Sequence, residues 1–93
     1  MKIKDIDVSD EVADKIARKH NVSVEQVYEV FWNEYDRPLV RRSDQVPGAY
    51  LAYGRTEAGR YLLAAFSLGA GGRAKILTAR DMTRAERRLY ERR

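Results

Sequence analysis

The stretch AYLAYGRTEAGRYLLAAFSLGAGGRAKILTA, residues 49–79, decides the fold. Residues 49–56 and 60–68 are rich in apolar and aromatic side chains, and the short connection between them ends in glycine, which predicts a β-hairpin. A glycine-rich turn at 69–72 leads into a third predicted strand, RAKILTA at 73–79. The middle strand is apolar at odd and even positions alike, which is typical of a strand covered on both faces. We therefore expect it at the centre of an antiparallel sheet.

Helical patterns precede this segment. Ser9 or Asp10 opens a first helix with a narrow apolar stripe, and Asn21 suits the left-handed conformation that ends a helix. Ser23 and Gln26 form a capping box that opens a second helix. The two helices are expected to form a pair.

A last helix follows the strands. Thr83 and Glu86 form another capping box and open a helix from Arg84 towards Arg92. Its predicted apolar stripe consists of Ala85 and Leu89, one turn apart, with the arginines turned away from it.

Two segments carry weaker signals. Ile3 and Ile6 alternate with charged residues, which indicates a short edge strand or an extended segment. Residues 34–48 contain both prolines and are expected to be mostly loop, with one short strand around 39–41. The order of elements predicts an α+β fold: two N-terminal helices, an antiparallel β-sheet of three to four strands and a C-terminal helix, in a single domain over residues 1–93.

Charge is distributed unevenly along the chain. Residues 1–36 carry five bases against nine acids, a net charge of −4, whereas residues 37–93 carry thirteen bases against five acids, a net charge of +8. Twelve of those thirteen bases are arginine, whose planar guanidinium group binds phosphate oxygens in pairs. This bias favours a polyanionic partner for the C-terminal part.

Composition excludes several chemistries. The chain has no cysteine and one histidine, so a thiol nucleophile, a disulfide framework and a Cys/His zinc site are excluded. No metal site or cofactor is indicated. The sequence GAGGRAK lacks the helix and hydroxyl residue of a phosphate-binding loop, and a hairpin turn is the better interpretation. The N-terminus has no apolar signal core and residues 61–66, the longest apolar run, are too short for a membrane span, so we expect a cytoplasmic protein.

Several side chains could carry chemistry, and each also has a structural interpretation. Arg80 ends a strand just before a helix cap, and Arg60 opens the neighbouring strand, so their guanidinium groups could converge. The alternative is that the basic last helix is a solvated surface with pairs such as Arg87 to Glu91. His20 suits a helix C-terminus as a partner of the helix dipole, and Tyr90 suits packing.

The aromatic residues near the end of the second helix allow two interpretations. Trp32 and Tyr35 could belong to the core or to a partner surface, and for Trp32 we favour the core.

Four motifs, taken in order, resemble a known family. They are Lys-His-Asn-Val at 19–22, Gly-Arg at 59–60, Ala-Arg at 79–80, and Glu-Arg at 86–87 with Tyr90. Together they resemble the BrnT group of ribonuclease toxins from bacterial type II toxin-antitoxin systems. The family usually has glycine where this chain has Asn21, a mild departure because asparagine also tolerates the left-handed conformation.

The resemblance implies a RelE-like fold and a metal-independent endoribonuclease in which the RNA 2′-OH attacks the scissile phosphate. Arg60 and Arg80 would form a cationic clamp on that phosphate, with Tyr90 and His20 as proton carriers. Glu86 would be a third proton carrier or would orient an arginine. The backbone of single-stranded RNA or mRNA would be held by basic residues: Lys19, Arg55, Arg84, Arg87 and Arg88.

The resemblance also implies partners. The expected partners are an RNA substrate and a cognate antitoxin protein, in a homodimer or a toxin-antitoxin hetero-oligomer, with no membrane. Two other functions agree with the composition: a nucleic-acid-binding module without catalysis, and an interaction protein whose basic face docks an acidic partner.

Overall fold

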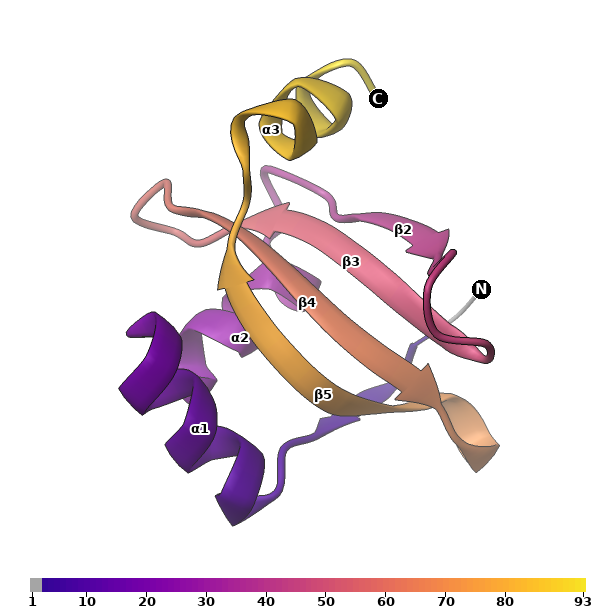
Figure 1. Cartoon of the computed structure of the whole chain (residues 1–93). Helices are drawn as coiled ribbons and strands as arrows, with labels where there is room; N and C mark the ends of the chain where they lie inside the picture. Colours follow the sequence, from indigo (N-terminus) through magenta and orange to yellow (C-terminus); the bar gives the residue numbers. More distant parts are fainter. Residues whose placement is uncertain (1–2) are drawn as a thin grey trace.

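A five-stranded mixed sheet organises the chain, in the order β1-β5-β4-β3-β2 (Figure 1). This computed structural model describes residues 3–93. The strands are β1 (Asp5–Asp7), β2 (Leu39–Arg42), β3 (Ala49–Arg55), β4 (Tyr61–Leu68) and β5 (Arg73–Asp81). The helices are α1 (Asp10–His20), α2 (Val24–Trp32) and α3 (Arg84–Glu91), with a 3-10 turn, η1 (Ala70–Gly72), before β5. No helix within residues 3–93 is long and apolar enough to cross a membrane.

The predicted α+β class and the central position of β4 are confirmed, whereas the sheet differs from the prediction in two respects. It has five strands instead of three to four, and it is mixed, because β1 pairs with β5 in parallel through Asp5 opposite Arg73 and Asp7 opposite Lys75. A pairing between residues so distant in the sequence leaves no local signal, so the pattern around Ile6 predicted an edge strand but not its direction.

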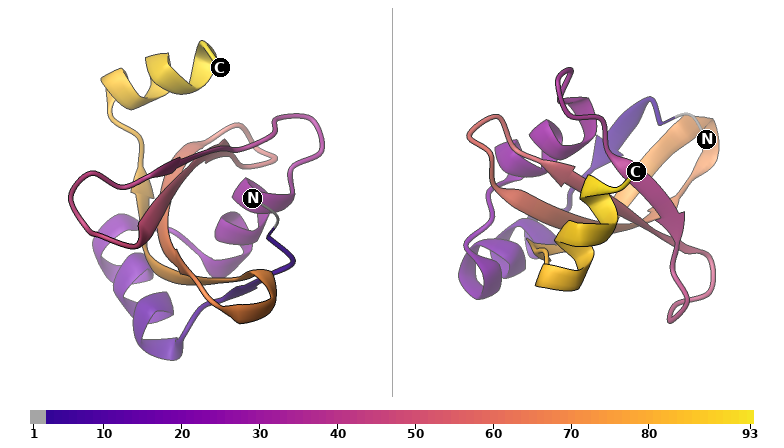
Figure 2. Two further views of the ribbon diagram at one scale, coloured as in Figure 1. Left: turned by 90° about the vertical axis from the view of Figure 1, so that its right-hand side faces the viewer. Right: turned by 90° about the horizontal axis from the view of Figure 1, so that it is seen from above.

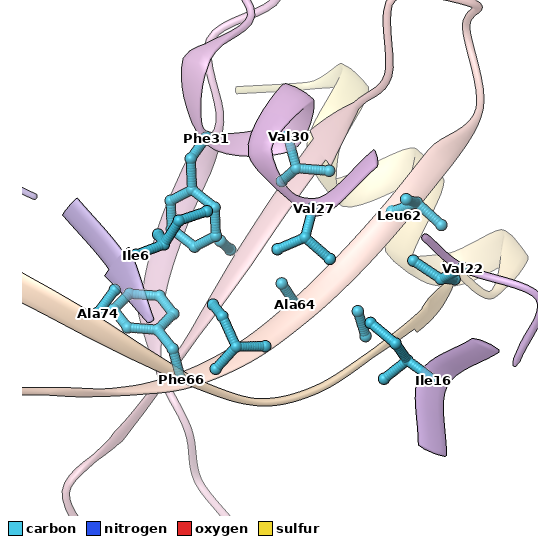
Figure 3. Packing of buried hydrophobic residues seen from close by; sticks show 13 residues of the cluster. Ile6, Ile16, Val22, Val27, Val30, Phe31, Leu62, Ala64, Phe66 and Ala74 are labelled. Atoms are coloured by element: carbon cyan, nitrogen blue, oxygen red, sulfur yellow. The ribbon is translucent and has the colours of Figure 1, made fainter. Parts of the chain in front are cut away.

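One face of the sheet is covered by α1 and α2, which build the main core. Figure 3 shows Val27, Val30 and Phe31 of α2 directed at the apolar side chains of β4. The Phe31 and Phe66 rings meet edge to face with centroids 5.4 Å apart. At Gly54 the helix lies so close that a Cβ would come within 2.8 Å of Val30 Cγ1. This packing fixes β3 and β4 from one side, and the other side of the same two strands forms the opposite face of the sheet.

The opposite face is covered only in part, by α3 (Figure 2). Alternation along the strands places Tyr53 and Leu63 here, and they form a second core cluster with Met82 and Tyr90. Since α3 is 8 residues long, it covers one end of the sheet. The candidate site lies around this helix.

The caps that the sequence predicts are confirmed. Asn21 ends α1 with φ of 53°, in the left-handed region. Both capping boxes form, one at Ser23 and one at Thr83. The hairpin turn between β3 and β4 contains Gly59 at φ of 97°, a conformation that glycine adopts without strain.

Two packing predictions are wrong. Ala85 is exposed, and α3 instead buries Tyr90, with Leu89 of the predicted stripe packed partly buried against the same cluster. Trp32, expected in the core, is 45% exposed at the end of α2, where its ring meets Phe31 with centroids 6.3 Å apart.

Candidate functional site

Arg80, near the end of β5, is held by Glu86 of α3. Its two terminal nitrogens donate to the two carboxylate oxygens of Glu86 at 2.8 and 3.0 Å, and Nη1 also donates to the Asp81 carbonyl at 3.0 Å. Glu86 Oε1 accepts from the Thr83 N–H as well, as part of the helix cap. The Arg80 hydrogen bond holds the pKa of Glu86 below its usual range and raises the pKa of Arg80. Both groups are therefore charged at neutral pH.

The Arg80 side chain lies on the same face of the sheet as Tyr53. Tyr53 is opposite Leu63, and Leu63 is opposite Arg80, so the three form one row across β3, β4 and β5. Burial raises the pKa of the Tyr53 phenol, and the charge of Glu86 raises it further, against the opposing charges of Arg41 and Arg80. Tyr53 therefore keeps its proton at neutral pH beside a cationic group.

Arg60, at the edge of the hairpin turn, uses every N–H that its guanidinium group has. Nε and Nη2 donate to the two Asp81 carboxylate oxygens at 2.8 and 3.2 Å. Nη1 donates to the Asn21 carbonyl at 2.7 Å and to Gln26 Oε1 at 3.2 Å, and Nη2 donates to the His20 carbonyl at 3.0 Å. Arg60 thus ties the end of α1 to the sheet and has no uncommitted donor in this arrangement.

His20 ends α1 near this cluster. Its carbonyl accepts from Arg60, and the charge of its ring contributes to lowering the pKa of Asp81, which the hydrogen bond from Arg60 lowers most. The His20 side chain is half-buried, and Lys19 beside it is exposed. His20 and Arg60, two of the predicted site residues, therefore lie close together, linked through the His20 carbonyl and through Asp81.

Two adjoining hollows beside α3 form a basic groove. They have volumes of about 340 and 370 Å³ and share Met82 and Arg87. We call them the α3 groove, which is lined by Gly59, Arg60, Tyr61, Asp81, Met82, Arg84, Arg87, Arg88 and Glu91. Three of the predicted RNA-binding arginines, Arg84, Arg87 and Arg88, therefore line the same hollow.

Tyr61 organises the arginines at the edge of this groove. The Arg87 guanidinium carbon lies 4.0 Å from the Tyr61 ring centroid, and that of Arg55 lies 4.6 Å from it. The Tyr61 hydroxyl donates to Glu91 at 2.9 Å. The intrahelical pair of Arg87 with Glu91 that the solvated-helix interpretation expects is absent from the described residues, because both side chains engage Tyr61.

Tyr90 lies beneath α3 with 1% of its surface exposed. Its hydroxyl is buried and has no hydrogen-bond partner within residues 3–93, and burial raises its pKa. The ring packs against Tyr61 and carries the Arg93 guanidinium 3.8 Å from its centroid. In this conformation Tyr90 acts in packing, and the hydroxyl is closed to a substrate.

The candidate residues therefore fall into two neighbouring groups. Glu86 joins Arg80 on the open sheet face, whereas His20 joins Arg60 at the end of α1. The two groups adjoin at the end of β5, where Arg80 and Asp81 are consecutive. No hydrogen bond or ion pair joins His20 to Arg80 in the described part of the chain.

Sequence analysis missed Tyr53 and Asp81. For Tyr53 the signal was available, since Leu51 and Tyr53 share a parity in a predicted strand next to the central one. Asp81 became visible only with the strand register, which places it opposite Leu62, close to the start of β4.

The donor set of the site consists of guanidinium groups, single carboxylates and phenols. Within residues 3–93 no three histidine, aspartate or glutamate side chains are grouped so that they could hold a metal ion. The arrangement can bind an anion through Arg80 and donate a proton from Tyr53.

Comparison with known proteins identifies the fold. No protein-family model matches the chain, and no curated protein matches it in sequence. Among solved structures, the crystal structure of the Brucella abortus ribonuclease toxin BrnT is similar with a TM-score of 0.69, covering 86% of this chain and 97% of that one at 12% sequence identity. The resemblance to the BrnT group is thereby confirmed at the level of the fold.

Proposed function

We propose that this chain is the toxin of a bacterial type II toxin-antitoxin system and an endoribonuclease that cleaves single-stranded RNA in the cytoplasm without a metal ion. The observation that carries the proposal is Arg80, fixed by Glu86 on the uncovered face of a fold shared with a ribonuclease toxin. The guanidinium group is half-exposed, and it is held by hydrogen bonds that leave two of its five N–H groups uncommitted.

In the proposed reaction the RNA 2′-OH attacks the adjacent phosphate, and the 5′ oxygen leaves. The free N–H groups of Arg80 stabilise the negative charge that gathers on the phosphoryl oxygens. A donor held in place before the reaction is effective because it does not reorganise when the charge develops. Glu86 fixes Arg80 in this way, and its lowered pKa makes it a weak base, so its proposed role is to orient the arginine.

Tyr53 and His20 are the proposed proton carriers. Tyr53 keeps its proton at neutral pH, so it is suited to protonate the leaving 5′ oxygen. His20 is proposed as the base that accepts the 2′-OH proton. In this proposal the RNA strand crosses the end of β5, where it would contact both Arg80 and His20. The family resemblance implies that Tyr90 is also a proton carrier. Its hydroxyl is buried, so it could transfer a proton to RNA only if α3 moved and exposed it.

The α3 groove is the proposed path of the RNA backbone. Arg84, Arg87 and Arg88 line it, Arg55 stacks on Tyr61 at its edge, and exposed Lys19 at the end of α1 is a further proposed contact. Arg60 acts there as a positioning residue, since its donors hold His20 and Asp81. Binding through these groups weakens steeply as salt concentration rises, because it releases counterions from RNA. The proposed inhibitor is an antitoxin protein, in a hetero-oligomer of the two.

The test is cleavage of a long single-stranded RNA in the presence of EDTA by the parent and by Arg80→Ala. Arg18→Ala is the matched control, because Arg18 also forms an ion pair, with Asp14, but on the exposed surface of α1. We expect Arg80→Ala to lose about 100- to 1,000-fold in rate, as for loss of one donor to a developing oxyanion, and Arg18→Ala to cleave at the parental rate.

Other outcomes have distinct meanings. Equal cleavage by all three proteins refutes the role of Arg80. Intact RNA in every lane, with a salt-sensitive gel shift by the parent, supports a binding module without catalysis, once translating mRNA has also been tested and remains intact.

A further inference from the structure

Exposed aromatic residues gather on α2 and on the loop after it. Tyr28, Trp32 and Tyr35 are 40%, 45% and 92% exposed, and they account for three of the five large apolar side chains that are exposed within residues 3–93. All three lie within eight positions of the sequence. Such a concentration on one surface is typical of an interaction site.

A cavity of about 540 Å³ lies beside Trp32 and Tyr35. Four charged residues line it. Three are acids, Glu34, Asp36 and Glu57, and one is a base, Arg55, which gives the lining a net charge of −2. This sign is opposite to that of the α3 groove. The charge of this lining therefore disfavours a polyanion such as RNA and favours a cationic ligand.

The walls of the cavity are fixed by hydrogen bonds. Asn33 is buried, its side-chain oxygen accepts from the backbone N–H groups of Tyr35 and Asp36 at 2.9 and 3.1 Å, and its amide donates to the Arg55 carbonyl at 3.0 Å. The Glu57 N–H donates to a carboxylate oxygen of Glu29 on α2 at 2.9 Å. The loop and the hairpin therefore present their side chains in one arrangement, which lowers the entropy cost of binding.

Two of the three carboxylates in the lining are not neutralised by an ion pair among the described residues. Within the described part of the chain, Glu34 and Glu57 take part in no ion pair. Arg55 does not neutralise them, because it donates to the Gly59 carbonyl, stacks on Tyr61 and approaches Asp36 only to 3.9 Å.

We propose that this cavity binds an arginine or lysine side chain from a basic segment of another protein. The aromatic faces of Trp32 and Tyr35 attract a cation, and Glu34 and Glu57 pair with it. Apolar residues beside that cation cover the exposed rings. A second copy offering its own basic α3 is the less favoured source, because contact between two unlike surfaces of identical chains does not close into a dimer. The proposal does not depend on RNA cleavage.

Trp32 is the only tryptophan in the chain, so the protein's tryptophan fluorescence reports on the end of α2, where the cavity lies. The probe is the peptide acetyl-RLRRLR-amide, with acetyl-ELEELE-amide as its acidic counterpart and a single-stranded RNA oligonucleotide as the third titrant. We expect a saturable, salt-sensitive change in emission with the basic peptide only.

Two double variants localise the effect. Glu34→Gln with Glu57→Gln removes the proposed partners of the cation, and Glu11→Gln with Asp14→Asn removes the same charge from exposed positions of α1. We expect the first to weaken peptide binding about 2- to 30-fold, the range for the loss of two exposed ion pairs, and the second to leave it unchanged.

Three results of the titrations overturn the proposal. They are an unchanged emission with the basic peptide, equal weakening in both double variants, and a saturable response to RNA. A concentration-dependent mass of the parent in light scattering, abolished by Glu34→Gln with Glu57→Gln, would assign the cavity to self-association instead and equally overturn it.

Discussion

Replacement of Arg60 by alanine separates a positioning role from a catalytic one, because this side chain makes five hydrogen bonds and is 25% exposed. The ion pair with Asp81 contributes little, since Asp81 is 63% exposed. The bonds to the carbonyls of His20 and Asn21 matter more, because the last carbonyls of a helix have no partner within it. At about 0.5 to 1 kcal/mol for each of the three hydrogen bonds to Asn21, Gln26 and His20, Arg60→Ala lowers the free energy of unfolding by about 1.5 to 3 kcal/mol.

Urea unfolding followed by circular dichroism measures this difference, and thermal unfolding shows it as a fall of about 6 to 24 °C in Tm. Arg18→Ala is again the control, because its single exposed pair is worth only about 0.3 to 0.5 kcal/mol. Arg60→Lys should lie between the parent and the alanine variant, since an ammonium group cannot reach all of these acceptors. A loss below about 0.5 kcal/mol in Arg60→Ala would refute the reasoning and leave Arg60 free for the phosphate.

Three further predictions concern the site. Tyr53→Phe should lower single-turnover RNA cleavage about 100-fold and change the unfolding free energy little, and an unchanged rate would exclude Tyr53 as the proton donor. Tyr90→Phe should leave cleavage unchanged and raise stability by up to about 1 kcal/mol, because it removes a buried hydroxyl without a partner; a folded variant that no longer cleaves would support Tyr90 as a proton carrier. Glu86 has a pKa below its usual 4.5, so its stabilising effect is complete above the unfolded-state pKa and is lost as pH falls through the folded-state value. The free energy of unfolding of Glu86→Gln should therefore fall less than that of the parent as the pH is lowered below about 4.5. Free energies of unfolding that fall in parallel for the two proteins would contradict the ion pair.

The candidate site was predictable in part. The position of Arg80 before a helix cap indicated a guanidinium group near the sheet end, and the capping box placed Glu86 in the first turn of the helix that follows. The sequence left two roles open for Glu86, and the bidentate pair favours orientation of Arg80 over proton transfer. Tyr90 could not be assigned from the sequence, because helical spacing alone does not tell which side of a short helix meets the sheet.

The sequence by itself determined the local elements of this protein. Capping residues such as Ser23 and Thr83, the left-handed Asn21 and the two-sided apolar pattern of β4 act through neighbours in the chain, so their signals are local and strong. Only the tertiary structure decided the parallel pairing of β1, the saturation of Arg60 and the burial of the Tyr90 hydroxyl. These features depend on contacts between residues tens of positions apart, whose geometry is set by the packing of helices against the sheet and not by any short stretch of sequence.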